Sequence, residues 1–317
     1  MPQSEKKLIR EIRRRARSGK SLVTGIGDDC AVLSVSPGHE LLVTTDFSIE
    51  NVHFRREWHP PELVGRRCLT RGLSDIAAMG GEPLAAFLSL AIPKDVPQRW
   101  VTRFLRGLLD LAREFSVPLA GGDTTQSLGG IQADIVVVGS VPTGLAVLRS
   151  GAKPGDHLYV TGDLGGAAAA LGRLRESKAL GARLIPHLSP LPRLAVGRWL
   201  RERRMASAMI DLSDGLSTDL EHICAESRVG AEIDEEAIPR ARVGQGKDRV
   251  AMELALHGGD DYELLFASSA AVPSKVAGVA VTRIGGITRS AGMRVIGSNG
   301  KHRLLKAGGW EHFAGNL

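Results

Sequence analysis

ADIVVVGSV (133–141), PTGLAVLRSGAKPGD (142–156) and HLYVT (157–161) follow one another in the middle of the chain. The first and third runs are rich in β-branched and aliphatic residues, which predicts two strands. The run between them combines prolines, glycines and charged residues, as a connection between domains does. A chain of 317 residues has room for two domains of about 150 residues each. We therefore expect one domain at 1–145 and a second at 146–317.

Similar patterns continue on both sides of this connection. LLVTT (41–45) and AMIDL (208–212) predict further strands. Four segments have apolar residues at helical spacing and predict helices: 61–80, 98–116, 165–180 and 216–228. A chain that mixes strands and helices in this way belongs to the α+β or α/β class.

The composition excludes several classes of protein. Hydrophobic residues make up 43% and charged residues 24%, which excludes wholesale disorder. The longest apolar run, LAAFLSLAI (84–92), is about half as long as a membrane-spanning helix, and no signal peptide is recognisable. Cys30, Cys68 and Cys224 are isolated, which fits neither a disulfide framework nor a zinc site. We expect a reduced, cytoplasmic protein with no membrane partner.

The net charge of +6 is concentrated at the N-terminus, where the first 20 residues carry eight basic and two acidic side chains. Leu8, Ile9, Ile12 and Ala16 lie near helical spacing, which predicts a helix with Ser4 as its N-cap and its basic face in water. Aromatic residues make up only 4% of the chain, and no nucleic-acid-binding motif is present. We therefore expect no nucleic-acid partner.

Aspartates recur beside glycines or hydroxyl residues, directly after apolar runs. They are Asp28 and Asp29 in GIGDDCAVL, Asp46 in VTTDF, Asp75 in GLSDIAAMGGEP, Asp123 in PLAGGDTT, Asp211 and Asp214 in MIDLSDGLSTDL, and Asp260 and Asp261 in HGGDDYE. Each motif alone is also an ordinary turn or helix cap, but strand ends and glycine turns are where α/β folds present ligands. Clustered carboxylates need cations, and oxygen ligands suit Mg²⁺ or Mn²⁺. The pattern indicates metal-assisted chemistry on nucleotide phosphates.

The common nucleotide-binding motifs are incomplete in this chain. SGKS (18–21) ends like a P-loop, but the glycine that should precede it is Arg14. GIGDD (25–29) begins like a dinucleotide-binding loop, but Cys30 stands at the position of the last glycine. A phosphotransferase of this sequence must have another architecture.

Seven segments occur in an order that resembles the bacterial thiamine-monophosphate kinases. They are GIGDDCAVL, TTDFSIENVHF, LSDIAAMGGEP, AGGDTTQS, LRSGAKPGD, IDLSDGLSTDLEHI and GGDDYELLF, and the resemblance continues to GGWEHF (308–313). This family lies in the superfamily of aminoimidazole ribonucleotide synthetase and selenophosphate synthetase. The resemblance implies an N-terminal α+β domain whose sheet pairs with its twin in a homodimer, and a C-terminal α/β domain, with nucleotide and metals in the cleft between them. The implied reaction converts ATP and thiamine monophosphate to ADP and thiamine diphosphate.

The resemblance also implies roles for individual residues. Magnesium ligands fall on Asp29, Thr44, Thr45, Asp46, Asp75, Asp123, Asp211 and Asp214, of which Asp46, Asp75, Asp123 and Asp211 are the expected catalytic group. ATP contacts fall on Gly122, Asp123, Arg149 and Ser213, and substrate contacts on His53, Asp260 and Trp310. Physically, Arg149 offers a fork of donors to phosphate, and Trp310 offers a face to a thiamine ring.

Three residues depart from the family pattern. Asp260 stands where the family usually has Glu, so its side chain is one methylene shorter. Arg71 stands where Asn is usual and adds a cation near the expected metals. Gly81 replaces a common Ala, which is a small change.

The expected mechanism is direct in-line transfer of the γ-phosphoryl group, because a phosphate acceptor is already an anionic nucleophile at neutral pH. Several Mg²⁺ ions, or Mn²⁺ in their place, would neutralise the two polyanions and hold them in line. One alternative is another ATP-dependent enzyme of the superfamily, such as an aminoimidazole ribonucleotide synthetase. A second alternative is a non-catalytic nucleotide-binding regulator on the same scaffold, although the nearly intact set of carboxylates argues against it.

Overall fold

The computed structural model describes residues 11–16, 20–24, 32–244 and 248–311. The chain divides into two compact units, which are Met1–Ile76 with Gly81–Gly144 and Ala77–Gly80 with Leu145–Leu317. The roles expected of the two predicted domains remain predictions. Asp28, Asp29 and Cys30 lie outside the described residues. Of the predicted N-terminal helix, residues 11–15 are helical and Ala16 is not, and the residues before 11 lie outside the described part of the chain.

The N-terminal unit is built on a four-stranded sheet with the order β3-β6-β4-β5. Its strands are β3 (His39–Ile49), β6 (Gln132–Pro142), β4 (Glu82–Ile92) and β5 (Leu119–Gln126). β6 is antiparallel to β3 and to β4, whereas β4 and β5 are parallel. Two short strands, β1 (Leu22–Thr24) and β2 (Val32–Leu33), pair separately.

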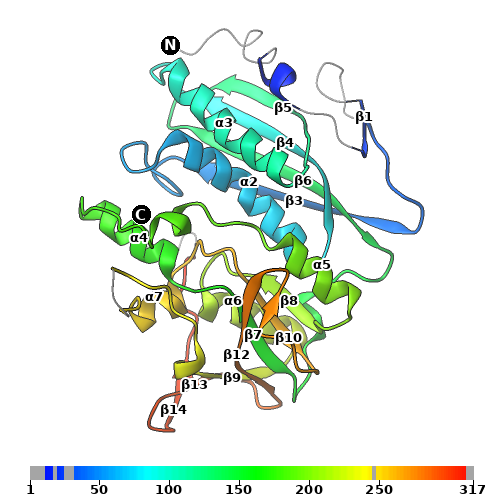
Figure 1. Cartoon of the computed structure of the whole chain (residues 1–317), viewed down its shortest axis with the longest axis vertical. Helices are drawn as coiled ribbons and strands as arrows, with labels where there is room; N and C mark the ends of the chain where they lie inside the picture. Colours follow the sequence, from blue (N-terminus) through cyan, green and yellow to red (C-terminus); the bar gives the residue numbers. More distant parts are fainter. Residues whose placement is uncertain (1–10, 17–19, 25–31, 245–247, 312–317) are drawn as a thin grey trace. The chain divides into compact units, whose positions relative to one another are not determined.

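Two helices, α2 (Pro61–Ala78) and α3 (Gln98–Glu114), cover one face of this sheet (Figure 1). They approach each other closely at Gly107, where an added Cβ would come within 2.0 Å of the Glu62 carbonyl oxygen. The buried side of α3 carries Trp100 and Phe104, which stack at a centroid distance of 5.5 Å. This packing leaves the opposite face of the sheet uncovered by either helix, because both helices lie on the same side.

The C-terminal unit is built on an eight-stranded sheet. Seven strands run in the order β14-β13-β9-β12-β7-β10-β8, and β11 pairs with β12. The strands are β7 (His157–Thr161), β8 (Ala208–Asp211), β9 (Gly230–Asp234), β10 (Leu264–Ser268), β11 (Lys275–Val276), β12 (Val279–Thr288), β13 (Gly292–Ile296) and β14 (His302–Leu305). The helices are α4 (Gly166–Arg175), α5 (Leu194–Glu202), α6 (Leu216–Ser227) and α7 (Met252–His257), with short 3₁₀ turns η1 (Arg149–Gly151), η2 (Ile185–Leu188) and η3 (Glu235–Ala237).

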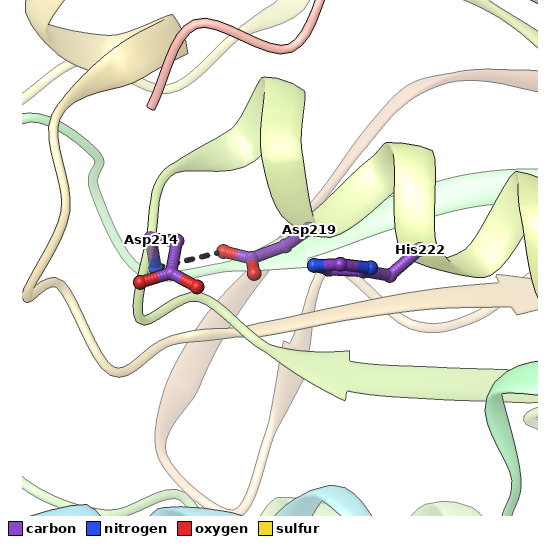
Figure 2. A group of neighbouring side chains, drawn as sticks. All are labelled: Asp214, Asp219 and His222. Carbon is purple, nitrogen blue, oxygen red and sulfur yellow. Dashed lines mark hydrogen bonds between the residues drawn. The ribbon is translucent and has the colours of Figure 1, made fainter. Parts of the chain in front are cut away.

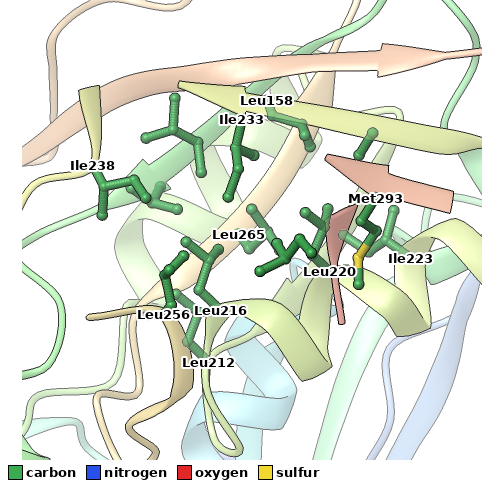
Figure 3. Packing of buried hydrophobic residues seen from close by; sticks show 14 of the residues in the cluster. Leu158, Leu212, Leu216, Leu220, Ile223, Ile233, Ile238, Leu256, Leu265 and Met293 are labelled. Atoms are coloured by element: carbon green, nitrogen blue, oxygen red, sulfur yellow. The ribbon is translucent and has the colours of Figure 1, made fainter. Parts of the chain in front are cut away.

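Helix α6 supplies much of the core of the C-terminal unit. Leu216, Leu220 and Ile223 share one face of this helix and pack among the buried residues of the sheet, such as Leu265 and Met293 (Figure 3). Their spacing of three and four residues is that of an amphipathic helix. The buried face holds α6 against the sheet and so fixes the turn that precedes the helix.

Most elements predicted from the sequence are confirmed. The strands expected at 41–45, 133–141, 157–161 and 208–212 are β3, β6, β7 and β8, and the expected helices are α2, α3, α4 and α6, each with somewhat different ends. The run LAAFLSLAI, noted only for its length, lies in strand β4. None of the helices in the described part of the chain is long and apolar enough to cross a membrane. Cys68 and Cys224 are free and buried.

Candidate active site

Strand β3 presents alternate side chains to α2 and to the opposite face of the N-terminal sheet. On the α2 side, the Thr44 hydroxyl donates a hydrogen bond to Asp75, and Arg71 Nη1 lies 3.4 Å from Asp46 Oδ1. Asp75 and Arg71 are one turn apart on α2, and they therefore meet two β3 residues on the same side of the strand. The structure thus brings three predicted ligands together and adds Arg71, whose charge offsets part of theirs.

Thr45 lies on the other face of the sheet, away from Thr44. Its hydroxyl donates to Asp134 Oδ1 at 2.8 Å. Asp134 pairs with Ser89, and Ser89 pairs with Asp123, so the register places Asp123 in the same row as Asp134. Because paired residues of neighbouring strands point to the same side, the predicted N-terminal ligands are split between the two faces of the sheet.

The remaining predicted residues of the N-terminal unit lie at its strand ends and edge. Gly122 and Asp123 are in the edge strand β5, where the exposed Asp123 carboxylate accepts a hydrogen bond from the Thr124 N–H at 2.8 Å. His53 follows β3 and is half-buried, and its Nδ1 accepts the Ile49 N–H at 3.0 Å. This bond fixes the orientation of the imidazole ring. Asp29 lies outside the described residues.

A second aspartate group lies where β8 ends and α6 begins. Asp211 is the last residue of β8, and the turn that follows carries Ser213 and Asp214. Asp219, in the first turn of α6, accepts the N–H of Asp214 at 3.2 Å. His222 is three residues further along α6 and lies beside Asp219 (Figure 2). One ligand atom from each of Asp214, Asp219 and His222 lies within 4.8 Å of the others.

The electrostatics of this second group are those of a cation site. Burial, together with the negative charges of Asp211 and Asp214, raises the pKa of Asp219 to about 8. A nearby divalent cation relieves such repulsion, and Mg²⁺ or Mn²⁺ prefers carboxylate oxygens as ligands. The carboxylates of Asp214 and Asp219 therefore fit the metal that the aspartate motifs predict, and His222 adds a nitrogen ligand beside them.

Trp310 lies beside this aspartate group. Its backbone N–H donates to the Asp214 carbonyl at 3.0 Å, and its side chain is 40% exposed. Asp214, Thr218, His222 and Trp310 are among the residues that line a cavity of about 290 Å³. The structure thus places a predicted metal ligand and the predicted ring-binding tryptophan on one cavity.

Arg149 lies at the start of η1 and is exposed. Its carbonyl accepts the Ser227 hydroxyl at 2.7 Å, which ties the backbone at Arg149 to the end of α6. Ser213, at the other end of α6, precedes the helix in the turn described above. The two predicted ATP contacts of this unit therefore flank one helix.

The predicted substrate residue Asp260 lies in a constrained segment between α7 and β10. Asp260 has φ of 68° and Tyr262 has φ of 51°, and left-handed backbone costs a residue other than glycine about 1–3 kcal/mol. The Asp260 N–H donates to the Ser213 carbonyl at 2.8 Å, and the Tyr262 N–H donates to the Leu212 carbonyl at 2.9 Å. A Cβ at Gly259 would lie 2.5 Å from the Ser213 carbonyl oxygen, so this pairing requires a glycine there.

Asp261 has a different role from its neighbour. It is buried, and its carboxylate accepts the N–H of Gly165 at 2.7 Å and of Ala167 at 3.4 Å, which caps the start of α4. Burial raises the pKa of Asp261 to about 8, against the effect of these two hydrogen bonds. The adjacent Glu263 accepts hydrogen bonds from Arg193 and from the Thr161 hydroxyl. Asp261 and Glu263 thus anchor the segment on both sides of Tyr262.

The structure adds four residues that the sequence analysis did not name as candidates: Asp134 in the N-terminal unit, and Asp219, His222 and Tyr262 in the C-terminal unit. Asp219 and His222 could have been found, because their separation of three residues on a predicted helix places them on one face. Asp134 and Tyr262 carried no such signal, since their partners depend on strand register and on the fold of an irregular segment.

The chain matches two family descriptions along most of its length. Residues 27–141 match the family AIR synthase related protein, N-terminal domain, and residues 153–298 match AIR synthase related protein, C-terminal domain. Structures of the hydrogenase maturation protein HypE share this fold, one of them with a TM-score of 0.80 at 18% identity, over 98% of this chain and 96% of the other.

Thiamine-monophosphate kinases are more similar in sequence. The chain is 41% identical to that of Salmonella typhimurium, over 80% of this chain and 78% of the other. It is 38% identical to that of Escherichia coli K12, over 95% of both chains.

Two solved structures extend the comparison. The chain resembles the thiamine-monophosphate kinase of Stenotrophomonas maltophilia K279a with a TM-score of 0.81 and 34% identity, over 93% of this chain and 97% of the other. It resembles AaThiL complexed with AMPPCP and TMP with a TM-score of 0.77 and 33% identity, over 98% and 97% of the two chains. The chain belongs to the thiamine-monophosphate kinase family, built on the two domains of the AIR synthase related proteins.

Proposed function

We propose that the chain transfers the γ-phosphoryl group of ATP directly to thiamine monophosphate and releases ADP and thiamine diphosphate. The observation that carries this proposal is the similarity, over 98% of the chain, to AaThiL holding AMPPCP, an ATP analogue, together with TMP. A protein that holds both substrates at once can transfer the phosphoryl group without an enzyme-bound intermediate.

We assign the residues of the reaction as follows. The metal ligands are Asp29, Thr44, Thr45, Asp46, Asp75, Asp123, Asp211 and Asp214, and Asp46, Asp75, Asp123 and Asp211 form the catalytic group. Gly122, Asp123, Arg149 and Ser213 contact ATP, and His53, Asp260 and Trp310 contact thiamine monophosphate. The Thr44–Asp46–Asp75 group, the crowded carboxylates around Asp219 and the cavity beside Trp310 support this assignment.

The chain's own residues supply orientation and charge. Mg²⁺ or Mn²⁺, when bound, would neutralise phosphate oxygens and lower the repulsion between donor and acceptor. Arg149 offers several N–H donors to a phosphate, and Ser213 offers a hydroxyl. The acceptor phosphate is already anionic, so no residue has to remove a proton from it before transfer. The side chains therefore act by positioning and by electrostatic complementarity.

We further propose that the chain forms a homodimer through the open face of the N-terminal sheet. Leu41, Val43 and Phe47 alternate along the edge strand β3, and they are 53%, 67% and 52% exposed. A row of large apolar side chains at a sheet edge is typical of an interface. A second copy, presenting the same row, would cover them. A cytoplasmic location, expected from the isolated cysteines, stays a prediction.

The reaction is tested by measuring ADP release from ATP with thiamine monophosphate, thiamine or formylglycinamidine ribonucleotide as acceptor. We expect ADP and thiamine diphosphate in equal amounts with thiamine monophosphate alone. Release with formylglycinamidine ribonucleotide would instead support an aminoimidazole ribonucleotide synthetase. Nucleotide binding without turnover of any acceptor would support a non-catalytic regulator.

A further inference from the structure

We propose that Tyr262 is a positioning residue that sets the Asp260 carboxylate for the thiamine end of the acceptor. This inference rests on the proposed function, in which Asp260 contacts thiamine monophosphate. The Tyr262 hydroxyl donates a hydrogen bond to Asp260 Oδ1 at 3.0 Å. The motif GGDDYELLF contains this tyrosine, but the sequence analysis assigned it no role.

The ring of Tyr262 is held more firmly than the carboxylate it contacts. Tyr262 is 2% exposed and is among the largest fully buried side chains of the described residues, whereas Asp260 is half-buried. A hydroxyl on a rigid, buried ring has few positions available, so the bond restricts the carboxylate rather than the ring. Hydrogen bonds to charged groups are stronger than those between neutral groups.

The backbone of the segment supports the same conclusion. Asp260 and Tyr262 both have left-handed φ angles, which residues other than glycine adopt only where surrounding contacts hold them. Those contacts are the backbone bonds to Ser213 and Leu212 and the buried Asp261 carboxylate on Gly165. These contacts hold the segment in the conformation in which the Tyr262 hydroxyl reaches the Asp260 carboxylate.

A carboxylate at this position can interact with the thiamine end of the acceptor. Thiamine carries a positively charged thiazolium ring and an aminopyrimidine, and a carboxylate can offset the charge or accept the amino N–H. A short Asp side chain reaches less far than Glu and has fewer rotamers. Fixing its direction with Tyr262 lowers the ordering entropy lost when the acceptor binds. Tyr262 should therefore influence binding of the acceptor and have little influence on the transfer of phosphate.

The test is steady-state kinetics of Tyr262→Phe with ATP and thiamine monophosphate varied in turn. Phe keeps the buried ring and removes the hydroxyl. We expect the KM for thiamine monophosphate to rise about 3- to 10-fold, because the hydroxyl acts on the acceptor only through Asp260, with kcat and the KM for ATP nearly unchanged. A fall in kcat with an unchanged KM for thiamine monophosphate would overturn the proposal.

Tyr159→Phe is the matched control, because Tyr159 is the other tyrosine of the chain and is also buried. Its hydroxyl accepts the Val272 N–H at 3.4 Å, so the variant should leave both KM values unchanged. In Asp260→Asn, Tyr262→Phe should add little further loss, since the hydroxyl acts through Asp260. If each substitution raised the KM for thiamine monophosphate by its own factor and the two factors multiplied in the double variant, the proposal would be contradicted. Absence of thiamine diphosphate synthesis by the unaltered protein would instead overturn the proposed function.

Discussion

The Asp219 carboxylate accepts the backbone N–H of Asp214 at 3.2 Å and thereby holds a predicted metal ligand in place from within α6. The same oxygen accepts the Gly215 N–H at 3.1 Å. Asp219 therefore shapes the turn between β8 and α6, and its burial beside the negative charges of Asp211 and Asp214 raises its pKa to about 8. One buried side chain contributes both to the stability of the turn and to the electrostatics of the site.

We expect Asp219→Ala to destabilise the protein by ~1–3 kcal/mol, because it leaves two backbone N–H groups without their acceptor. Urea unfolding measures this loss. Asp219→Asn keeps an acceptor oxygen and should lose less. An equal loss of stability in both variants would contradict the role assigned to the acceptor oxygen.

Asp261 should make stability depend on pH. Its folded-state pKa of about 8 lies above the value of about 4 in an unfolded chain, so the folded state retains a proton that the unfolded state releases. The resulting contribution to the free energy of unfolding is fully present below about pH 4 and is lost as pH rises to about 8. Urea unfolding across this range should therefore show a steeper decline in the unaltered protein than in Asp261→Asn. Parallel profiles would contradict this expectation.

Turnover should depend entirely on a divalent cation, because each unit carries a group of carboxylates whose oxygens suit Mg²⁺ or Mn²⁺ as ligands. Excess EDTA should abolish activity, and added Mg²⁺ or Mn²⁺ should restore it. Electron paramagnetic resonance of Mn²⁺ gives an independent measure of binding. Full turnover in EDTA, or no bound Mn²⁺, would refute the metal assignment.

Asp123→Asn should lower kcat by about a thousandfold, since it removes the charge assigned to a metal-bridged contact and keeps the shape of the side chain. Steady-state kinetics with both substrates varied measures the effect. Asp110→Asn, on the exposed side of α3, is the matched control and should leave kcat unchanged. If Asp123→Asn merely weakens binding of thiamine monophosphate, the division of roles between Asp123 and Asp260 is wrong.

Val43→Glu should shift the protein from dimer to monomer, because it places a charge in the apolar row on β3. Sedimentation over a range of concentrations measures the change. Leu128→Glu is the control, since Leu128 is 98% exposed in the loop between β5 and β6 and lies outside this row. An unaltered protein that remains a monomer at all concentrations would refute the proposed dimer.

The candidate residues of the two units differ in how well the sequence predicted them. Asp211, Ser213 and Asp214 follow a short aliphatic run and precede an amphipathic helix, so local patterns predicted the turn that carries them. Along β3, the same patterns grouped Thr44 with Thr45, although the alternation of side chains sends them to opposite faces. The strand itself was predicted correctly, but the sequence did not predict that Thr44 contacts Asp75 on one face and Thr45 contacts Asp134 on the other.

Two properties of this protein were determined by the sequence alone: the elements that carry or flank Asp46, Asp75, Asp211 and Asp214, and the family to which the motifs belong. The spacing of hydrophobic residues, the turn residues and the order of the motifs can all be read along the chain, without knowing which distant residues come into contact. The tertiary structure alone decided that Asp134 meets Thr45 and that Tyr262 reaches Asp260. These contacts depend on register and on strained backbone angles, which are set by the packing of the whole unit because no single residue prefers them.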